Sequence, residues 1–222
     1  MSAIKICGIY RAEDAELINR YKPDYFGMII DFKRSHRSIS KKEAAMLRAA
    51  IDKSIPAVGV FVNKELSYIK SFIDDGIIDI AQLHGAEDNS YIRRLKGLIC
   101  KPVWKAFKIR TRQDVEKAML SEADLIILDN GYGTGKTFDW SLIQDIKRPF
   151  ALAGGINLEN IEDALNSLNP YLIDISSGVE TDKLKDSDKI EKAVKAVHDF
   201  ERRQICQKDV LVFTEDNIFL KH

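Results

Sequence analysis

The stretch "FALAGGINLENIEDALNSL", residues 150–168, contains one complete strand-and-helix unit. It opens with a short apolar run that ends at Gly154-Gly155, a pattern typical of a buried strand followed by a turn. Further on, apolar residues recur with helical spacing at Ile161, Ala164, Leu165 and Leu168. The stretch therefore predicts a strand, a glycine-containing loop and an amphipathic helix that covers the strand.

The same unit recurs along the chain. Eight short apolar runs are each followed by a stretch with helical spacing, and they lie at Ile4–Cys7, Tyr25–Ile30, Ala57–Val62, Ile77–Leu83, Val103–Phe107, Leu125–Leu128, Phe150–Ala153 and Leu172–Ile175. Strands that alternate with helices are parallel, because each crossover helix returns the chain to the same end of the sheet. Eight units in about 200 residues predict a single-domain α/β protein with a closed (β/α)8 TIM barrel. A doubly wound open sheet is the alternative.

The predicted barrel, a catalytic domain, covers residues 1–203, and residues 204–222 form a C-terminal tail of unknown role. An apolar run, Val210 to Phe213, lies in this tail. It is consistent with a strand on a neighbouring surface, a partner-binding tail or an artificial extension, and the sequence does not distinguish these alternatives.

Composition restricts the partners of the chain. Among 222 residues, 34 are Lys or Arg and 34 are Asp or Glu, so no overall positive field attracts nucleic acid or an anionic membrane. No apolar run reaches the ~20 residues of a spanning helix, and Met1–Arg11 lacks the core of a secretory signal. Three distant cysteines, Cys7, Cys100 and Cys206, indicate a reducing compartment. We therefore expect a cytoplasmic protein without membrane or nucleic-acid partners, either a monomer or a homodimer.

One segment looks like a nucleotide-binding P-loop. Gly135-Lys136-Thr137 matches the end of that motif, but Gly131 leaves only three residues before Gly135 where the motif needs four. Asp139 is placed like an N-cap, which indicates that the next helix starts later. The spacing argues against an NTPase and leaves the glycines to be explained otherwise.

In barrels of this kind the active site lies on the loops that follow the strands. The residues at these positions are Cys7, the basic segment Lys33–Arg37, His84, Asp129, Gly154-Gly155 and Ser176-Ser177-Gly178. All of them therefore fall on one predicted rim.

The last two loops form a candidate phosphate site. Glycine-opened loops after the seventh and eighth strands present backbone N–H groups to an anion, and a side chain there would keep a phosphate away. We predict that Gly154, Gly155, Ser177 and Gly178 bind phosphate. The alternative is that these glycines only turn the chain out of each strand.

Cys7 and Asp129 are the candidate catalytic pair. A thiol acts as a base only as the thiolate, and Lys5, on the same side of the strand, would favour that form. A carboxylate at the end of an apolar strand, such as Asp129, rarely stays buried without a task. The alternatives are a buried apolar role for Cys7 and loop capping by Asp129.

Two further rim residues are candidates for substrate binding. Arg37 can hold a planar carboxylate with two parallel hydrogen bonds, although the basic loop around it could simply be solvated. His84 could be an acid–base group or a histidine satisfied by a backbone partner.

The motifs resemble the phosphoribosylanthranilate isomerase family of tryptophan biosynthesis. The matching segments, in order, are "KICGI" at Lys5–Ile9, "KRSHRSIS" at Lys33–Ser40, "VGVFVN" at Val58–Asn63, "QLHG" at Gln82–Gly85, "LDNGYGTGKTFDW" at Leu128–Trp140, "LAGGINLENI" at Leu152–Ile161 and "DISSGVE" at Asp174–Glu180. By this resemblance the glycine-rich segment after Asp129 is a loop beside the active site, similar to a P-loop only by chance.

The resemblance implies an Amadori rearrangement without a cofactor or metal. N-(5-phosphoribosyl)anthranilate, a small phosphorylated substrate, becomes 1-(2-carboxyphenylamino)-1-deoxyribulose 5-phosphate, as in an aldose–ketose isomerase. Asp129 is then the general acid, Cys7 the general base and Arg37 the residue that holds the anthranilate carboxylate. The chain departs from the family at Tyr10, where Thr is commoner, and in its short loop after Asp129.

Two rivals differ in testable ways. Another sugar-phosphate barrel, such as an epimerase, would share the phosphate loops but usually needs metal ligands. A non-catalytic scaffold would use the tail, residues 209–222, to recruit a partner, and it would have no need for both Cys7 and Asp129.

Overall fold

The computed structural model describes residues 2–130 and 139–216, with side chains described to residue 205. Eight parallel strands form a closed barrel, because β1 pairs with both β2 and β9. The barrel strands are β1 (Ala3–Cys7), β2 (Tyr25–Ile30), β4 (Ala57–Phe61), β5 (Ile80–Leu83), β6 (Val103–Lys108), β7 (Leu125–Asp129), β8 (Phe150–Leu152) and β9 (Leu172–Ile175). The predicted (β/α)8 barrel is confirmed, and each of the eight predicted runs overlaps one barrel strand.

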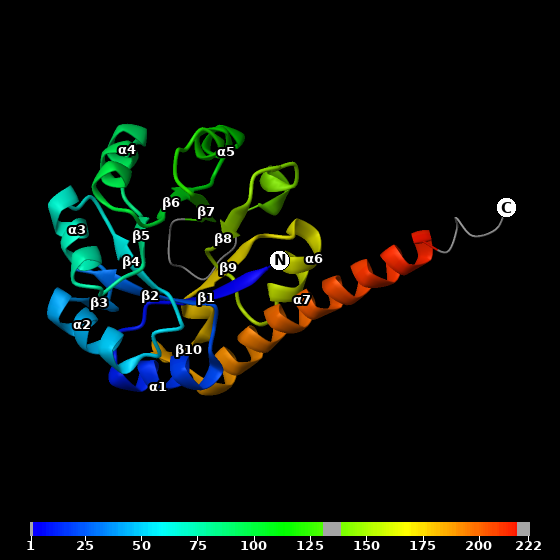
Figure 1. Cartoon of the computed structure of the whole chain (residues 1–222), viewed down its shortest axis with the longest axis horizontal. Helices are drawn as coiled ribbons and strands as arrows, with labels where there is room; N and C mark the ends of the chain where they lie inside the picture. Colours follow the sequence, from blue (N-terminus) through cyan, green and yellow to red (C-terminus); the bar gives the residue numbers. More distant parts are fainter. Residues whose placement is uncertain (1, 131–138, 217–222) are drawn as a thin grey trace.

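Helices surround the barrel, as Figure 1 shows. In the described parts of the chain they are α1 (Ala12–Tyr21), α2 (Lys41–Ala50), α3 (Leu66–Asp74), α4 (Asn89–Leu98), α5 (Arg112–Met119), α6 (Ile161–Leu168) and α7 (Ser187–Asp216). Between β7 and β8 the described chain has only the short 3-10 helix η1 (Trp140–Ile143). Asp139 caps η1, since its side chain accepts a hydrogen bond from Ser141 N at 2.9 Å. The glycine-rich segment 131–138 lies outside the described residues.

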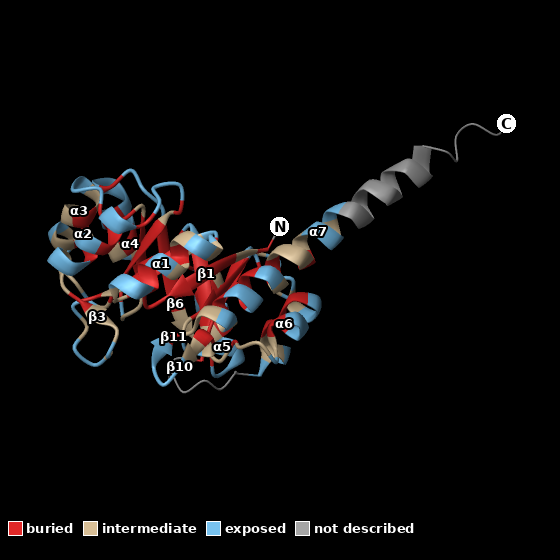
Figure 2. Cartoon of the chain, turned by 90° about the horizontal axis from the view of Figure 1, so that it is seen from below, coloured by how far each residue is buried: buried red, intermediate tan, exposed pale blue. Residues whose placement is uncertain are grey.

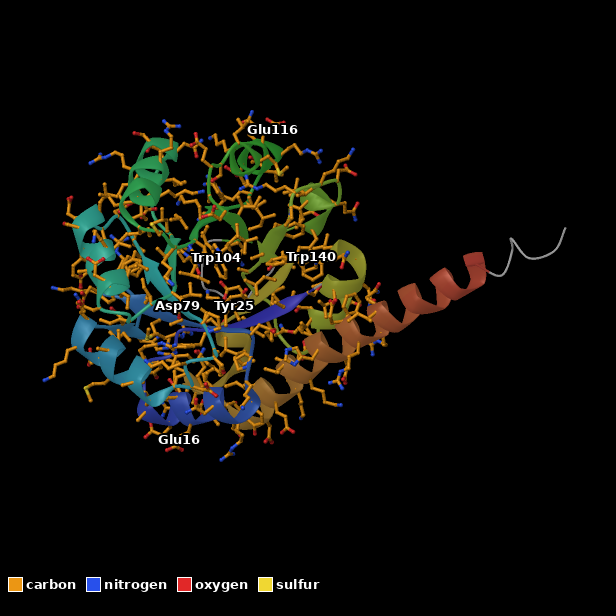
Figure 3. All side chains as sticks on the ribbon, viewed as in Figure 1. Glu16, Tyr25, Asp79, Trp104, Glu116 and Trp140 are labelled. Atoms are coloured by element: carbon orange, nitrogen blue, oxygen red, sulfur yellow. The ribbon has the colours of Figure 1, made fainter. Side chains whose placement is uncertain are left out.

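Alternation along each strand creates two apolar layers. Outward residues such as Ile4, Ile6 and Ile126 pack under the helices, whereas Ile127 and Trp104 fill the barrel interior. Figure 2 shows the strands buried beneath exposed helix faces. In Figure 3, Trp104 and Tyr25 lie within the ring of strands, and their rings meet edge to face at 5.2 Å. The interior is therefore a packed core that supports the mouth above it.

Small elements that the sequence pattern does not predict stand near the carboxyl ends of the strands. β3 (Ser38–Ile39) adds to β2 after the basic loop, and η2 (Ser177–Val179) follows β9. A two-stranded hairpin, β10 (Glu180–Thr181) with β11 (Leu184–Lys185), comes next. Each is too short to leave a periodic signal in the sequence.

The tail begins inside a helix. α7 continues through residue 203 to Asp216 and extends beyond the barrel in Figure 1. Of the alternatives for the tail, a strand over Val210–Phe213 is wrong, because the backbone is helical there. No Gly or Pro lies between Ser187 and Asp216 to end the helix. The division at residue 203 stays a prediction. In the described residues, no helix is both long and apolar enough to cross a membrane.

Candidate active site

The predicted rim residues meet in one cavity. A cavity of about 840 Å³ opens at the carboxyl ends of the strands. Its lining includes seven of the eight predicted site residues, namely Cys7, Arg37, His84, Asp129, Gly154, Gly155 and Ser177. Gly178 lies beside it, where its α-carbon faces the carbonyl of Ile156 from the other predicted phosphate loop. The topology therefore brings together residues that are up to 170 positions apart, from Cys7 to Ser177.

A buried polar layer supports the floor of this cavity. The register of β1 and β9 places Lys5 opposite Asp174, and Lys5 Nζ donates to Asp174 Oδ2 at 2.7 Å. The same ammonium donates to Gln82 Oε1 at 2.8 Å, across the barrel on β5. Lys5 is completely buried, so the ion pair and the amide oxygen offset the cost of removing its charge from water.

Cys7 points into the barrel on the same side of β1 as Lys5. A β-carbon added to Gly27 on the neighbouring strand would lie 2.8 Å from Lys5 Cε and 2.9 Å from Cys7 Sγ, so both side chains crowd the same space. Burial raises the pKa of the Cys7 thiol above its ordinary value, and this outweighs the attraction of Lys5 and Lys185 for the thiolate. Asp174 adds repulsion. Lys5 favours the thiolate, as predicted, but its effect is not dominant.

Asp129 ends β7 with its side chain toward the cavity. In β7, Ile126 and Leu128 face the helices, so alternation turns Asp129 inward. Gly154 makes room for this carboxylate. It has φ +77°, and a β-carbon there would clash with Asp129 Oδ1 and lie 2.6 Å from Asn130 N. Glycine at this position is thus required both by backbone conformation and by the approach of the acid.

His84 faces side chains. Its Nε2 lies 3.5 Å from Asp129 Oδ2, and its Nδ1 lies 3.4 Å from Gln82 Nε2. In the described residues no backbone partner of the ring is found, so that interpretation of His84 is not supported. The ring instead links the Gln82 amide, which holds Lys5, to the candidate acid.

Arg37 is held by a carboxylate that the sequence pattern did not single out. Its Nε and Nη2 donate to the two oxygens of Glu180 at 2.7 and 2.6 Å. Lys185 Nζ donates to Glu180 Oε1 at 2.8 Å and to Ser176 O at 3.0 Å. Burial pushes the pKa of Glu180 upward, but hydrogen bonds and attraction from Arg37 and Lys185 leave it below its ordinary value. The two parallel hydrogen bonds fix the plane of the Arg37 guanidinium at the cavity wall.

Glu180→Gln is expected to lower the free energy of unfolding by about 2 kcal/mol, the size of a charge-assisted hydrogen bond. Glu180 is only 5% exposed and the Lys185 side chain is fully buried, so the change leaves a buried ammonium poorly compensated. Glu116→Gln makes the same chemical change at an exposed position on α5 and is the matched control (Figure 3).

The measurement is urea unfolding at pH 7 and at decreasing pH. Because the folded-state pKa of Glu180 is lowered, its stabilisation is present above the unfolded pKa, near ~4.3, and is lost as pH falls below that value. The difference between wild type and Glu180→Gln should shrink accordingly. A difference that stays constant on acidification, or equal losses for both variants, would contradict the assignment.

The rate of Cys7 alkylation by iodoacetamide is expected to rise about tenfold per pH unit even above pH ~8.5, where the alkylation rate of an ordinary thiol stops rising. The raised pKa of Cys7 means that the thiolate is still a minor species there. Mass spectrometry of the Cys7 peptide gives the rate, with N-acetylcysteine as reference and circular dichroism as a check on folding. A plateau at or below pH ~8.5 would refute the raised pKa.

A carboxyl group and a thiol from different strands line one cavity at the mouth of a closed parallel barrel. The fold and this cavity define the protein as a (β/α)8-barrel protein with an enzyme-like site. The described residues contain no group of three or more His, Cys, Asp or Glu side chains arranged to hold a metal.

Comparison with known proteins gives the particular family. Residues 4–196 match the family described as N-(5'phosphoribosyl)anthranilate (PRA) isomerase. The N-(5'-phosphoribosyl)anthranilate isomerase of Clostridium acetobutylicum is 42% identical over 209 residues, covering 90% of this chain and all of the relative. That of Endomicrobium trichonymphae is 44% identical over 200 residues, covering 88% and 98%. The chain belongs to the N-(5'-phosphoribosyl)anthranilate isomerase family.

Solved structures agree with the sequence comparison. Phosphoribosyl anthranilate isomerase from Thermotoga maritima superposes with a TM-score of 0.81 at 34% identity, over 89% of this chain and 99% of that one. A phosphoribosyl anthranilate isomerase in complex with reduced 1-(o-carboxyphenylamino)-1-deoxyribulose 5-phosphate gives a TM-score of 0.79 at 33% identity, with the same coverage. Another Thermotoga maritima structure is described as monomers generated from a dimeric enzyme, with a TM-score of 0.78 at 33% identity and the same coverage.

Proposed function

We propose that the protein converts N-(5'-phosphoribosyl)anthranilate into 1-(2-carboxyphenylamino)-1-deoxyribulose 5-phosphate, as an aldose–ketose isomerase of tryptophan biosynthesis. The observation that carries this proposal is the presence of Cys7 and Asp129, from separate strands, in the lining of one cavity that also contains Arg37 and the glycines that follow β8. Membership of the isomerase family supports the same reaction.

In the proposed mechanism Asp129 donates a proton to the ribose ring oxygen. The C1–O bond breaks as the nitrogen lone pair forms a C1=N bond, which gives a Schiff base. A carboxylic acid suits this step because it can protonate the leaving oxygen while the ring opens. His84, 3.5 Å from Asp129 Oδ2, is placed to influence the orientation of that carboxyl group.

Cys7 then removes the proton from C2 as the thiolate. The C2–H electron pair forms a C1=C2 bond, and the nitrogen recovers its lone pair. The resulting enolamine takes a proton at C1 while its C2 hydroxyl loses a proton, and the C2=O ketone forms. A thiolate whose pKa is raised by burial is scarce but is a stronger base once formed, and Lys5 favours its formation. The rearrangement moves hydrogen within one molecule, so the proposal includes neither a cofactor nor a metal.

Two sets of binding groups at the cavity orient the substrate in this proposal. Gly154, Gly155, Ser177 and Gly178 bind the phosphate, and Arg37 binds the anthranilate carboxylate with the N–H groups that Glu180 leaves open. Interactions away from the reacting carbons fix C2 near the base, which lowers the entropic part of the barrier. We also propose that the protein acts in the cytoplasm as a monomer or homodimer. Neither nucleic acid nor a membrane is a partner in this proposal.

Product identification tests this proposal. The wild-type protein is incubated with freshly prepared phosphoribosylanthranilate, and the mixture is reduced with borohydride and separated by chromatography beside the authentic reduced product. A protein-free reaction measures the background. Formation of the reduced ribulose derivative above background supports the isomerase. Unchanged substrate, or a product with another retention time, would reject it.

A further inference from the structure

The hairpin of β10 and β11 contains an unusual turn. Glu180 pairs with Lys185 and Thr181 with Leu184, so only Asp182 and Lys183 connect the strands. Both have positive φ, 52° for Asp182 and 67° for Lys183, as in a type I′ turn. The second central position of such a turn favours glycine, because a β-carbon is disfavoured in the left-handed region. A lysine at this position opposes the local preference of the backbone, which motivates a search for a function of its side chain.

Contacts with Tyr10 and Arg37 hold the turn against the wall of the cavity. Tyr10 Oη donates to the Lys183 carbonyl at 3.3 Å, and the Tyr10 ring meets His36 edge to face at 6.1 Å. Next to them, Arg37 donates two hydrogen bonds to Glu180, the first residue of the hairpin. These contacts place Lys183 on the same wall as Arg37, and Lys183 lines the cavity.

Lys183 has no carboxylate partner among the residues that the structure describes. Arg37 and Lys185 both pair with Glu180, so one carboxylate serves two cations. In the part of the chain that the structure describes, no hydrogen bond or ion pair of Lys183 Nζ is found. Burial lowers the pKa of His36, and repulsion from Arg37 and Lys183 adds to this, while Glu180 and a hydrogen bond to the Lys183 backbone act in the opposite direction.

We propose that the ε-ammonium of Lys183 contacts the aromatic carboxylate of the substrate, beside Arg37, as a second cation that determines specificity for a carboxylated aryl group. This inference rests on the proposed function. An ammonium on a long flexible stem can approach one carboxylate oxygen while a guanidinium N–H approaches the other. A carboxylate shared by both cations is bound more tightly than by Arg37 alone, since Glu180 already neutralises part of the charge of Arg37.

The test uses binding, so that it does not depend on turnover. Two ligands are titrated calorimetrically into the full-length protein: reduced 1-(2-carboxyphenylamino)-1-deoxyribulose 5-phosphate and its phenylamino counterpart without the carboxylate. The variants are Lys183→Gly, which removes the ammonium and suits the type I′ turn, and Lys147→Ala, which removes a lysine at an exposed position before β8. Thermal unfolding is recorded for each.

Lys183→Gly is expected to weaken the carboxylated ligand about five- to tenfold and to bind the ligand without a carboxylate as the wild type does. Its unfolding temperature should equal or exceed that of the wild type, because glycine relieves the positive φ. Lys147→Ala should bind both ligands unchanged. A purely structural Lys183 would leave both affinities unchanged.

Four outcomes overturn the proposal. The first is unchanged affinity of Lys183→Gly for both ligands, and the second is an equal loss of affinity for both ligands, which would assign the ammonium to the phosphate. The third is an equal loss in Lys147→Ala, which would indicate a general charge effect. The fourth is failure of the wild type to bind either ligand. If the wild type binds the carboxylated ligand but does not convert phosphoribosylanthranilate, the proposed function fails, and the comparison of the two ligands still decides the role of Lys183.

Discussion

Cys7→Ser is expected to lower kcat by at least about 10²-fold, the contribution of a positioned general base. A serine hydroxyl is a far weaker acid than a thiol, so almost none of it is ionised near pH 7, and Lys5 cannot offset that difference. The KM for the substrate should change little, because Sγ contacts only the reacting hydrogen in the proposed mechanism. Initial rates across a substrate series give both constants.

Cys100→Ser is the matched control for this change. Cys100 is exposed, outside the cavity lining, and the variant should retain wild-type activity. Thermal unfolding of Cys7→Ser must be close to that of the wild type for the loss to be read as catalytic. A folded Cys7→Ser with wild-type kcat would remove Cys7 from the mechanism.

Asp129→Asn is expected to lower kcat by at least about 10²-fold while retaining affinity for the reduced product. The amide has nearly the shape of the carboxylic acid and can still approach His84, but it cannot transfer a proton to the ring oxygen. The loss should therefore appear in kcat, since the acid is required only as the ring opens.

Asp145→Asn is a suitable control for this second change, because the side chain of Asp145, between η1 and β8, is 83% exposed and is not among the residues that line the cavity. It should leave kcat and KM unchanged. An Asp129→Asn variant that loses affinity for the reduced product in proportion to its rate would show that Asp129 acts in binding, and not as the acid.

The barrel could be predicted from the sequence because each strand is a local apolar run. In β2 and β9 the predicted and observed bounds agree, since both strands are buried and end at turns. Where the run continued through loop residues, as at Ile77 before β5, the predicted strand was too long. Burial of Ile77 and Ile78 beside the sheet made loop residues look like part of the strand.

The contacts between charged groups could not be predicted in this way. Lys5 meets Asp174 through the register of β1 on β9, a pairing 169 residues apart. Arg37 meets Glu180 across 143 residues, through a hairpin whose strands contain two residues each. Such pairings follow from closure of the barrel, which no local pattern encodes.

Some inward-facing residues could be predicted from the sequence, but only after the strand that contains them had been assigned. From Asp174, alternation along β9 predicts that Ser176 also faces inward, and both line the cavity. The same argument predicted the shared direction of Lys5 and Cys7. Glu180 belonged to a recognised motif, "SSGVE", yet its partner could be identified only in three dimensions.

The central claim is tested most directly by the rate at which anthranilate fluorescence falls. The assay uses freshly made phosphoribosylanthranilate and equal amounts of wild type, Cys7→Ser and Asp129→Asn. The proposed mechanism predicts rapid loss of fluorescence with the wild type and at least about 10²-fold slower loss with each variant. A wild type that binds the reduced product but leaves the fluorescence unchanged would contradict the isomerase, and variants as fast as the wild type would contradict the acid–base pair.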